Sequence, residues 1–340
     1  MSTQRRGRLV LLGSTMAGVL CAGLVSQAGP AGAAEQIDPR RLVRGVESTV
    51  PHLQDGVIRV GPRSLKVSVP VRASGQTLLG RSGKDWVVHT TYRSASHVHA
   101  VRRGRAARLV PGGKPKENPS LIRSVRLSRG GQLLVWTAES RGGTETTVVR
   151  LADGKVFGIA PFNYEDHFPT SQPLDAKGNR ILVAVGAPYV WNPTTARARQ
   201  LPVGASSGAM MEDDVIFVAT GRWSYGPTKI SSPGVPAWTA RNFEPHDVSP
   251  DGRLVLGHQI TRSHGRQVLQ LRRMSDGTVL RKWAYGARGG RETTAAFEND
   301  TRVVFEVNRG GASALVRCRV KGGCTRASSL GGTLTFPHER

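Results

Sequence analysis

The chain has 340 residues, with 48 Lys and Arg against 24 Asp and Glu, and a formal net charge of +24. A surface this positive attracts polyanions without needing a specific site. Only 6% of the residues are aromatic, and none lies within the arginine clusters, whereas single-strand nucleic-acid grooves interleave arginines with exposed aromatic rings. The composition favours an anionic partner and argues against a specific nucleic acid.

Residues 1–34 have the features of a secretory signal peptide. Arg5, Arg6 and Arg8 precede an apolar run from Leu9 to about Val25, and small residues follow up to Ala34, as at an A-x-A cleavage site. The run is short and rich in Gly, Ser and Thr, so it suits a membrane span poorly. We expect a secreted or cell-wall-associated bacterial protein with no transmembrane span once mature. The choice between Sec and twin-arginine export stays open.

After the signal, apolar runs of about five to eight residues alternate with Gly, Pro, Asp and Asn, a pattern typical of strands and turns. Helical periodicity is almost absent, and 41 glycines supply turn positions. This pattern predicts an all-β fold.

A four-stranded unit repeats along the chain after a lead-in segment at 35–54. Its copies cover, in chain order, 77–110, 124–160, 171–203, a degenerate copy starting near 208, 246–283 and 293–328. Two outer strands at 55–69 and one inner strand at 332–337 would close a seventh unit from both ends of the chain. Seven units after the signal average about 44 residues, the period of a propeller blade. We therefore predict a single β-propeller domain at 55–337 with seven blades. A six-bladed ring and a two-sheet sandwich are the alternatives.

The unit at 246–283 is the clearest copy, with tight turns predicted at Asp251-Gly252 and Asp276-Gly277. Its phrase SPDGRLVL, residues 249–256, resembles the repeats of exported bacterial TolB-like and WD40-like β-propeller proteins. No unit carries the paired Gly-His and Trp-Asp signature of true WD40 repeats. The resemblance implies a propeller fold and a binding role, but no particular reaction.

One motif occurs twice: Asn, aromatic, Glu, any residue, His, at 163–167 and again at 242–246. Each copy leads into an innermost strand, so both could open on one face near the central channel. The candidate residues are Glu165, His167, Glu244 and His246 for catalysis, Asn163, Tyr164, Asn242 and Phe243 for binding, and His167 and His246 for a divalent metal. Histidine and carboxylate together suit Zn²⁺ or acid–base chemistry. The alternative interpretation is structural: the histidine bonds a carbonyl, the glutamate pairs with amides or arginines, and the aromatic ring fills the gap between blades.

Two segments concentrate arginine. Arg102, Arg103, Arg105 and Arg108 fall in one predicted hairpin, and a second group contains Arg262, Arg266, Arg272 and Arg273. We interpret both as solvated edges or as surfaces attracted to wall polymers and polysaccharides.

Cys318 and Cys324 are the cysteines that remain after the signal, and a predicted hairpin turn at Lys321–Gly323 separates them. Directly opposed residues of antiparallel strands lie about 4.5–5.5 Å apart at Cα, which a disulfide can bridge. A metal or redox pair is the weaker interpretation, because no histidine lies nearby.

Two functional classes follow from these patterns. The first is a monomeric, non-catalytic scaffold that holds an envelope protein or an anionic cell-wall polymer or polysaccharide, without a cofactor. The second is a propeller enzyme, a carbohydrate-active hydrolase or lyase with a Glu and His site, with or without a divalent metal.

Overall fold

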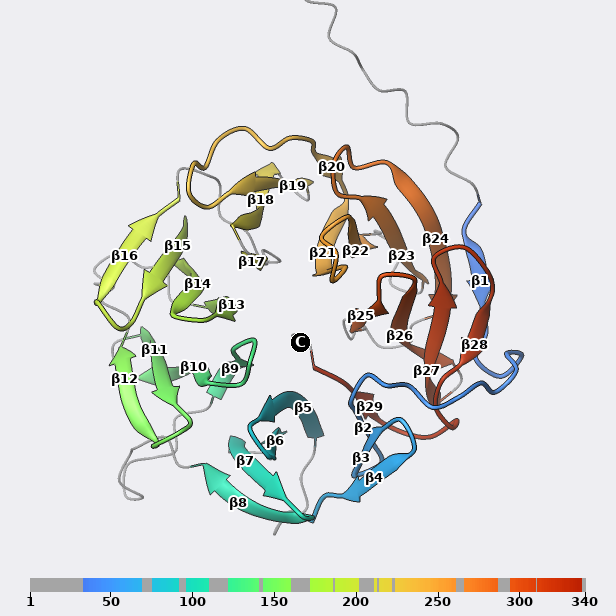
Figure 1. The fold of residues 1–340 in the computed structure, drawn as a ribbon, viewed down its shortest axis with the longest axis horizontal. Helices are drawn as coiled ribbons and strands as arrows, with labels where there is room; N and C mark the ends of the chain where they lie inside the picture. The colour runs from blue at the N-terminus through green and yellow to red at the C-terminus, as the bar shows by residue number, and fades with distance from the viewer. Residues whose placement is uncertain are drawn as a thin grey trace, which may run out of the picture. The chain divides into compact units, whose positions relative to one another are not determined.

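Short apolar runs ended by glycine turns fold into four-stranded sheets, and seven of these blades surround a central axis (Figure 1). The computed structural model describes residues 33–68, 75–91, 96–109, 122–140, 143–159, 172–185, 187–201, 211–212, 214–221, 224–260, 266–286, 294–309 and 311–337. These residues form strands and turns without a helix. In the same residues, nothing resembles an apolar helix of membrane-spanning length. The prediction of a seven-bladed all-β propeller is confirmed.

Six blades follow one another along the chain, each antiparallel and each with its first strand nearest to the ring centre (Figure 1). Their strands are β5 (Gly75–Ser82), β6 (Asp85–Thr91), β7 (Ser96–Arg102), β8 (Arg105–Leu109); β9 (Ile122–Leu127), β10 (Leu133–Ser140), β11 (Gly143–Arg150), β12 (Lys155–Ile159); β13 (Gln172–Lys177), β14 (Arg180–Val185), β15 (Ala187–Asn192), β16 (Arg197–Gln200); β17 (Met211–Glu212), β18 (Val215–Gly221), β19 (Ser224–Lys229), β20 (Ala240–Arg241); β21 (Phe243–Val248), β22 (Leu254–Gln259), β23 (Arg266–Arg273), β24 (Val279–Gly286); and β25 (Ala295–Asn299), β26 (Arg302–Arg309), β27 (Ala312–Arg319), β28 (Cys324–Arg326). Gly252 and Gly277 adopt φ of 71° and 70°, the left-handed conformation that the predicted turns require.

The seventh blade joins the two ends of the described chain. Its innermost strand is β29 (Leu334–Thr335), and the other three are β2 (His52–Gln54), β3 (Val57–Val60) and β4 (Arg63–Lys66). Strands β3, β4 and β29 fall in the segments predicted to close the ring. Strand β2 comes from the segment that we expected to lead into the domain, and it pairs with β29.

A further N-terminal strand widens another blade. β1 (Glu35–Ile37) pairs in parallel with β24 and becomes the fifth and outermost strand of that sheet. The expected lead-in segment therefore contributes strands to two different blades.

The hydrophobic core lies between neighbouring blades. Leu79 and Val87 of one blade pack with Val125 and Leu134 of the next. Similar clusters join the closing blade to β5–β8 and the blade of β21–β24 to that of β25–β28. Each blade thus buries both faces, as closure of a radial repeat requires.

A buried ion pair fixes the segment that leads into β2. The Glu298 carboxylate accepts hydrogen bonds from the Thr49 backbone amide at 2.8 Å, the Thr49 hydroxyl at 2.9 Å and the Arg317 guanidinium at 2.6 Å. Arg317 in turn donates to the carbonyl oxygens of Val46 and Glu47, at 2.8 and 3.2 Å. These contacts, the closing clamp, hold the N-terminal segment against the last blade before the closing one.

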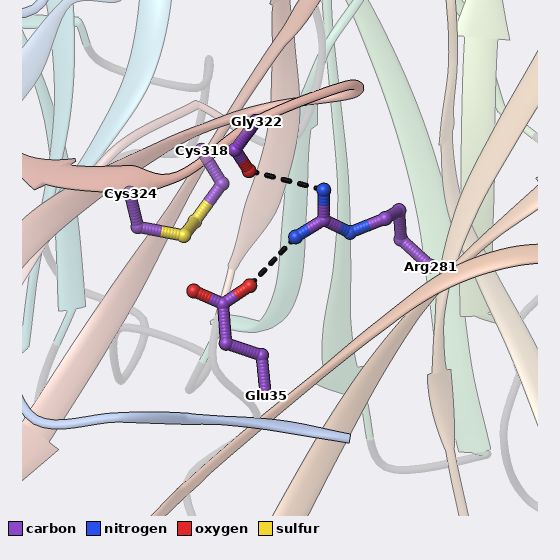
Figure 2. The surroundings of a disulfide bond; sticks show 5 residues. All are labelled: Glu35, Arg281, Cys318, Gly322 and Cys324. Atoms are coloured by element: carbon purple, nitrogen blue, oxygen red, sulfur yellow. Dashed lines mark hydrogen bonds and ion pairs between the residues drawn. A yellow bond between two sulfur atoms is a disulfide. The ribbon is translucent and has the colours of Figure 1, made fainter. Parts of the chain in front are cut away.

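The cysteine pair lies where the hairpin predicted it. Cys318 and Cys324 are directly opposed on β27 and β28, with Cα atoms 4.1 Å apart and sulfur atoms at bonding distance. Figure 2 shows Arg281 beside this disulfide, donating to the Gly322 carbonyl at 3.0 Å and to the Glu35 carboxylate at 2.6 Å. Arg281 of β24 therefore links β1 to the disulfide hairpin.

Candidate functional site

The second copy of the repeated motif forms the start of β21, the innermost strand of its blade. Asn242 has φ of 54°, which asparagine tolerates better than most residues, and its carbonyl accepts the Ile260 amide at 2.8 Å. Phe243 is fully buried against Phe217 and Trp238 of the preceding blade. The aromatic residue thus occupies the gap between two blades.

His246 projects from a β-bulge in β21. Pro245 pairs with Gly257 and Asp247 with Leu256, which leaves His246 as the extra residue on its strand. A bulge of this kind bends the strand and re-aims a side chain. The carboxylate of Asp247, the next residue, accepts a hydrogen bond from the Phe297 amide of β25 at 2.7 Å. Asp247 therefore links its blade to the next one.

The bulge directs His246 into a line of three polar side chains. The His246 Nε2 atom lies 2.6 Å from His258 Nδ1, and His258 Nε2 lies 2.6 Å from the Tyr285 hydroxyl. His258 belongs to β22, and Tyr285 belongs to β24 and is buried between two blades. This line, the His–His–Tyr relay, runs from the innermost strand to the interior of the ring wall.

Burial keeps His246 neutral near pH 7. Desolvation, joined by the positive charge of Arg126, lowers the pKa of His246 to about 4. Arg126 belongs to β9, which lies across the ring centre from β21 (Figure 1). An imidazole with one ring proton donates through one nitrogen and accepts through the other, so His258 can take part in both contacts of the line at once. The arrangement can hold or pass a proton, and its far end stops in the hydrophobic core.

The two copies of the motif cannot be compared in space. Glu244 is partly buried on β21, opposite His258 in the strand register. Asn163, Tyr164, Glu165 and His167 lie outside the described residues. No group of three or more His, Cys, Asp or Glu side chains that could hold a metal occurs among the residues with described positions. The shared pocket of two Glu and two His therefore stays a prediction.

The first arginine cluster divides into a paired and an unpaired part. Arg102 forms a two-pronged ion pair with Asp85, with a distance of 2.9 Å from Nη2 to Oδ2. Arg103 and Gly104 form a two-residue turn in which both residues have positive φ, 49° and 82°. This conformation costs a residue other than glycine about 1–2 kcal/mol. The turn therefore holds an arginine at a position that Asn or Gly would occupy with less strain.

This turn borders a hollow between the closing blade and its neighbour. The hollow has a volume of about 570 Å³ and is lined by Lys66, Ser68, Arg103 and Arg105, among others. Lys66, Arg103 and Arg105 are exposed, and none of their side chains has a hydrogen bond or ion pair with another described residue. Among the described residues, no acidic side chain lines the hollow. We call Lys66, Arg103 and Arg105 the basic hollow.

The arginine-rich pattern of 102–108 identified two members of the basic hollow, but Lys66 was missed. Lys66 lies outside the arginine clusters of the sequence. The backbone hydrogen bond from the Ser68 amide to the Gly104 carbonyl brings Lys66 close to the turn of Arg103 and Gly104. Two members of the second arginine cluster make contacts within the fold instead, and Arg262 lies outside the described residues. Arg273 pairs with Asp276 at 2.7 Å, and Arg272 lies 4.7 Å from the centre of the Phe243 ring.

Comparisons with known proteins support the fold. No protein-family model and no curated protein matches the sequence. An uncharacterised protein of Listeria monocytogenes EGD-e is similar with a TM-score of 0.52 and 12% identity, over 79% of this chain and 87% of that one. The β-propeller domain of Cps50 (Swd1) of Myceliophteria thermophila gives 0.51 and 12%, over 77% and 88%. TolB of Acinetobacter baumannii gives 0.46 and 11%, over 78% and 67%.

The similarities with a TM-score above 0.5 support the fold and carry no information about function. The chain is a β-propeller of seven four-stranded blades. The resemblance predicted from the SPDGRLVL phrase is confirmed at the level of the fold. The fold does not by itself define a function, because function depends on the site that the propeller carries.

Proposed function

We propose that this protein is an exported, non-catalytic propeller that binds an anionic polymer of the cell envelope through the basic hollow. The observation that carries the proposal is the set of three exposed cations, Lys66, Arg103 and Arg105, around one hollow that no acid of the described chain lines. Elsewhere in the chain, cations such as Arg102 and Arg273 are neutralised by nearby carboxylates. Three unpaired cations around one hollow suit a chain of repeated negative charges.

Two further features support export and a binding role. The signal-like residues 1–34 and the cysteine pair at bonding distance both suit a protein that folds in an oxidising compartment. Among the described motif residues, His246 is engaged within the fold by His258. The enzyme alternative depends on Glu165 and His167, which lie outside the described residues.

The experiment compares two triple variants with equal changes in net charge. The site variant replaces Lys66, Arg103 and Arg105 with Glu. The control variant replaces Arg197, Lys229 and Arg241 with Glu, and these three residues are exposed on other blades and have no described ion pair. Binding of labelled polygalacturonate and polyphosphate to the mature protein is measured at low salt. We expect the site variant to bind at least about tenfold more weakly than the wild type, and the control to lose much less.

Equal losses in both variants would show that the overall charge attracts polyanions and that the hollow is no site. A pull-down from the cell-envelope extract at low and high salt tests the protein partner. Binding through exposed charges weakens at high salt because the ions are screened. A defined envelope protein that survives high salt and still binds the site variant would overturn the proposal.

A further inference from the structure

A second, larger cavity opens on the face of the ring that carries the tight turns between first and second strands. It has a volume of about 790 Å³, within the range of small-molecule pockets. The closing blade contributes the start of β4, the next blade contributes Gly83 of its β5–β6 turn, and the third contributes Ser128 to Gly131 of its β9–β10 turn. The cavity therefore sits where three blades meet.

The inside of this cavity is apolar. Its wall includes Val60, Leu65, Leu79, Trp86, Leu127 and Pro337. Leu79 and Leu127 are buried, and Trp86 is partly buried. No Asp or Glu occurs among the described residues that line the cavity, so the wall suits an alkyl or aromatic body.

Two guanidinium groups line the same cavity without an acidic partner. Arg63 and Arg81 are exposed, and neither guanidinium forms a hydrogen bond or ion pair within the described part of the chain. Arg81 lies over the Trp86 ring, 5.5 Å from its centre, which positions its charge beside the apolar wall. A third lining arginine, Arg129, is 3.8 Å from the Asp175 carboxylate and is already neutralised.

We propose that this cavity binds an amphipathic anion, with an alkyl body against the apolar wall and the anionic head on Arg63 and Arg81. Charge complementarity selects this occupant. An uncharged apolar ligand leaves both guanidiniums unpaired, and a cationic amphiphile is repelled by them. Guanidinium groups bind carboxylate and phosphate in two-pronged hydrogen bonds, so either head satisfies the site.

This inference does not rest on the basic hollow. The two sites use different cations, and they meet only at Leu65, which lines both. If the polymer-binding test contradicted the proposal for the basic hollow, the proposal for the cavity would still stand. A negative result for the cavity would likewise leave the proposal for the basic hollow unaffected.

The test is titration calorimetry of the mature protein with three amphiphiles of equal chain length, each below its micelle concentration. The probes are dodecanoate, dodecyl phosphate and dodecyltrimethylammonium. We expect one molecule of dodecanoate or dodecyl phosphate to bind per chain, and the cationic probe to bind at least about tenfold more weakly. The tighter of the two anions identifies the preferred head group, a carboxylate or a phosphate.

Three variants assign the binding to the cavity. Arg63→Gln with Arg81→Gln should weaken anion binding at least about tenfold, whereas Arg197→Gln with Arg241→Gln changes the net charge equally and should have little effect. Ser64→Trp places a large ring at a lining position that is exposed in the fold, so it should block binding without disturbing the core. If the paired arginine variant does not fold, Ser64→Trp decides alone.

Three results would overturn the proposal. They are the absence of one-to-one binding by either anion, binding of the cationic probe as tight as that of the anions, and binding that Ser64→Trp leaves unchanged.

Discussion

Replacing Glu298 with Gln should loosen the closure of the ring. The carboxylate receives the Arg317 guanidinium and two groups of Thr49, and thereby anchors the segment that leads into β2. The Glu298 side chain is only 2% exposed and that of Arg317 11%, so water cannot replace the lost contacts. The substitution leaves the buried guanidinium without its counter-charge, which is strongly destabilising.

The pKa of Glu298 gives the magnitude. Burial by itself would raise this pKa, but the hydrogen bonds from Arg317 and Thr49 outweigh burial and lower it to about 2 from the ordinary 4.5. That difference corresponds to about 3 kcal/mol of stability when the carboxylate is ionised. Because the folded pKa is the lower one, this stability is complete above pH 4.5 and is lost as the pH falls towards 2.

The assay is urea unfolding of wild type and Glu298→Gln at pH 7, 4 and 2.5, followed by tryptophan fluorescence. We expect the variant to be less stable by about 3 kcal/mol at pH 7, and the difference to shrink at the two lower pH values. Asp153→Asn is the control, since the pKa of Asp153 is also lowered to about 2, chiefly by Arg150, but both side chains are exposed. A difference that stays constant with pH, or one no larger than that of the control, would refute the reasoning.

Two other predictions concern the disulfide and the relay. Unreduced mature protein should give no free thiol on titration, and two thiols per chain would contradict the disulfide. Cys318→Ser with Cys324→Ser should lower the free energy of unfolding by about 2 kcal/mol, as expected for a short loop. Because the folded pKa of His246 is about 4, wild type should lose stability as the pH falls from about 6.5 to 4, when the unfolded chain gains a proton. His246→Gln should lose less between pH 7.5 and 4.5 in the same unfolding assay, and an equal loss would count against a neutral buried imidazole.

The blades could be predicted from sequence because the information for each blade is local. In the blade of β21–β24, the Asp251-Gly252 and Asp276-Gly277 turns join strands that are neighbours in both sequence and space. Ring closure was predictable for a different reason: 55–69 and 332–337 were incomplete units whose missing strands complemented one another.

The parts that were missed depend on contacts between distant segments. β1 and β2 have three residues each, too few to show an alternating pattern, and β1 pairs in parallel without a hairpin turn. The closing clamp joins Glu298 to a residue 249 positions away. No local pattern in the sequence distinguishes the buried Glu298 from an acid that is exposed.

The repeated motif selected His246, but its partners could not be read from the motif. A bulge exists because two paired strands differ by one residue in their register, so it is a property of β21 and β22 together and not of either strand alone. Tyr285 reaches His258 from β24, with the strand β23 between them. Glu298 occupies a bulge in β25 as well, and there the extra residue binds the closing segment of the chain. In both blades, a bulge in the innermost strand thus directs a polar side chain into a buried contact with a segment outside that strand.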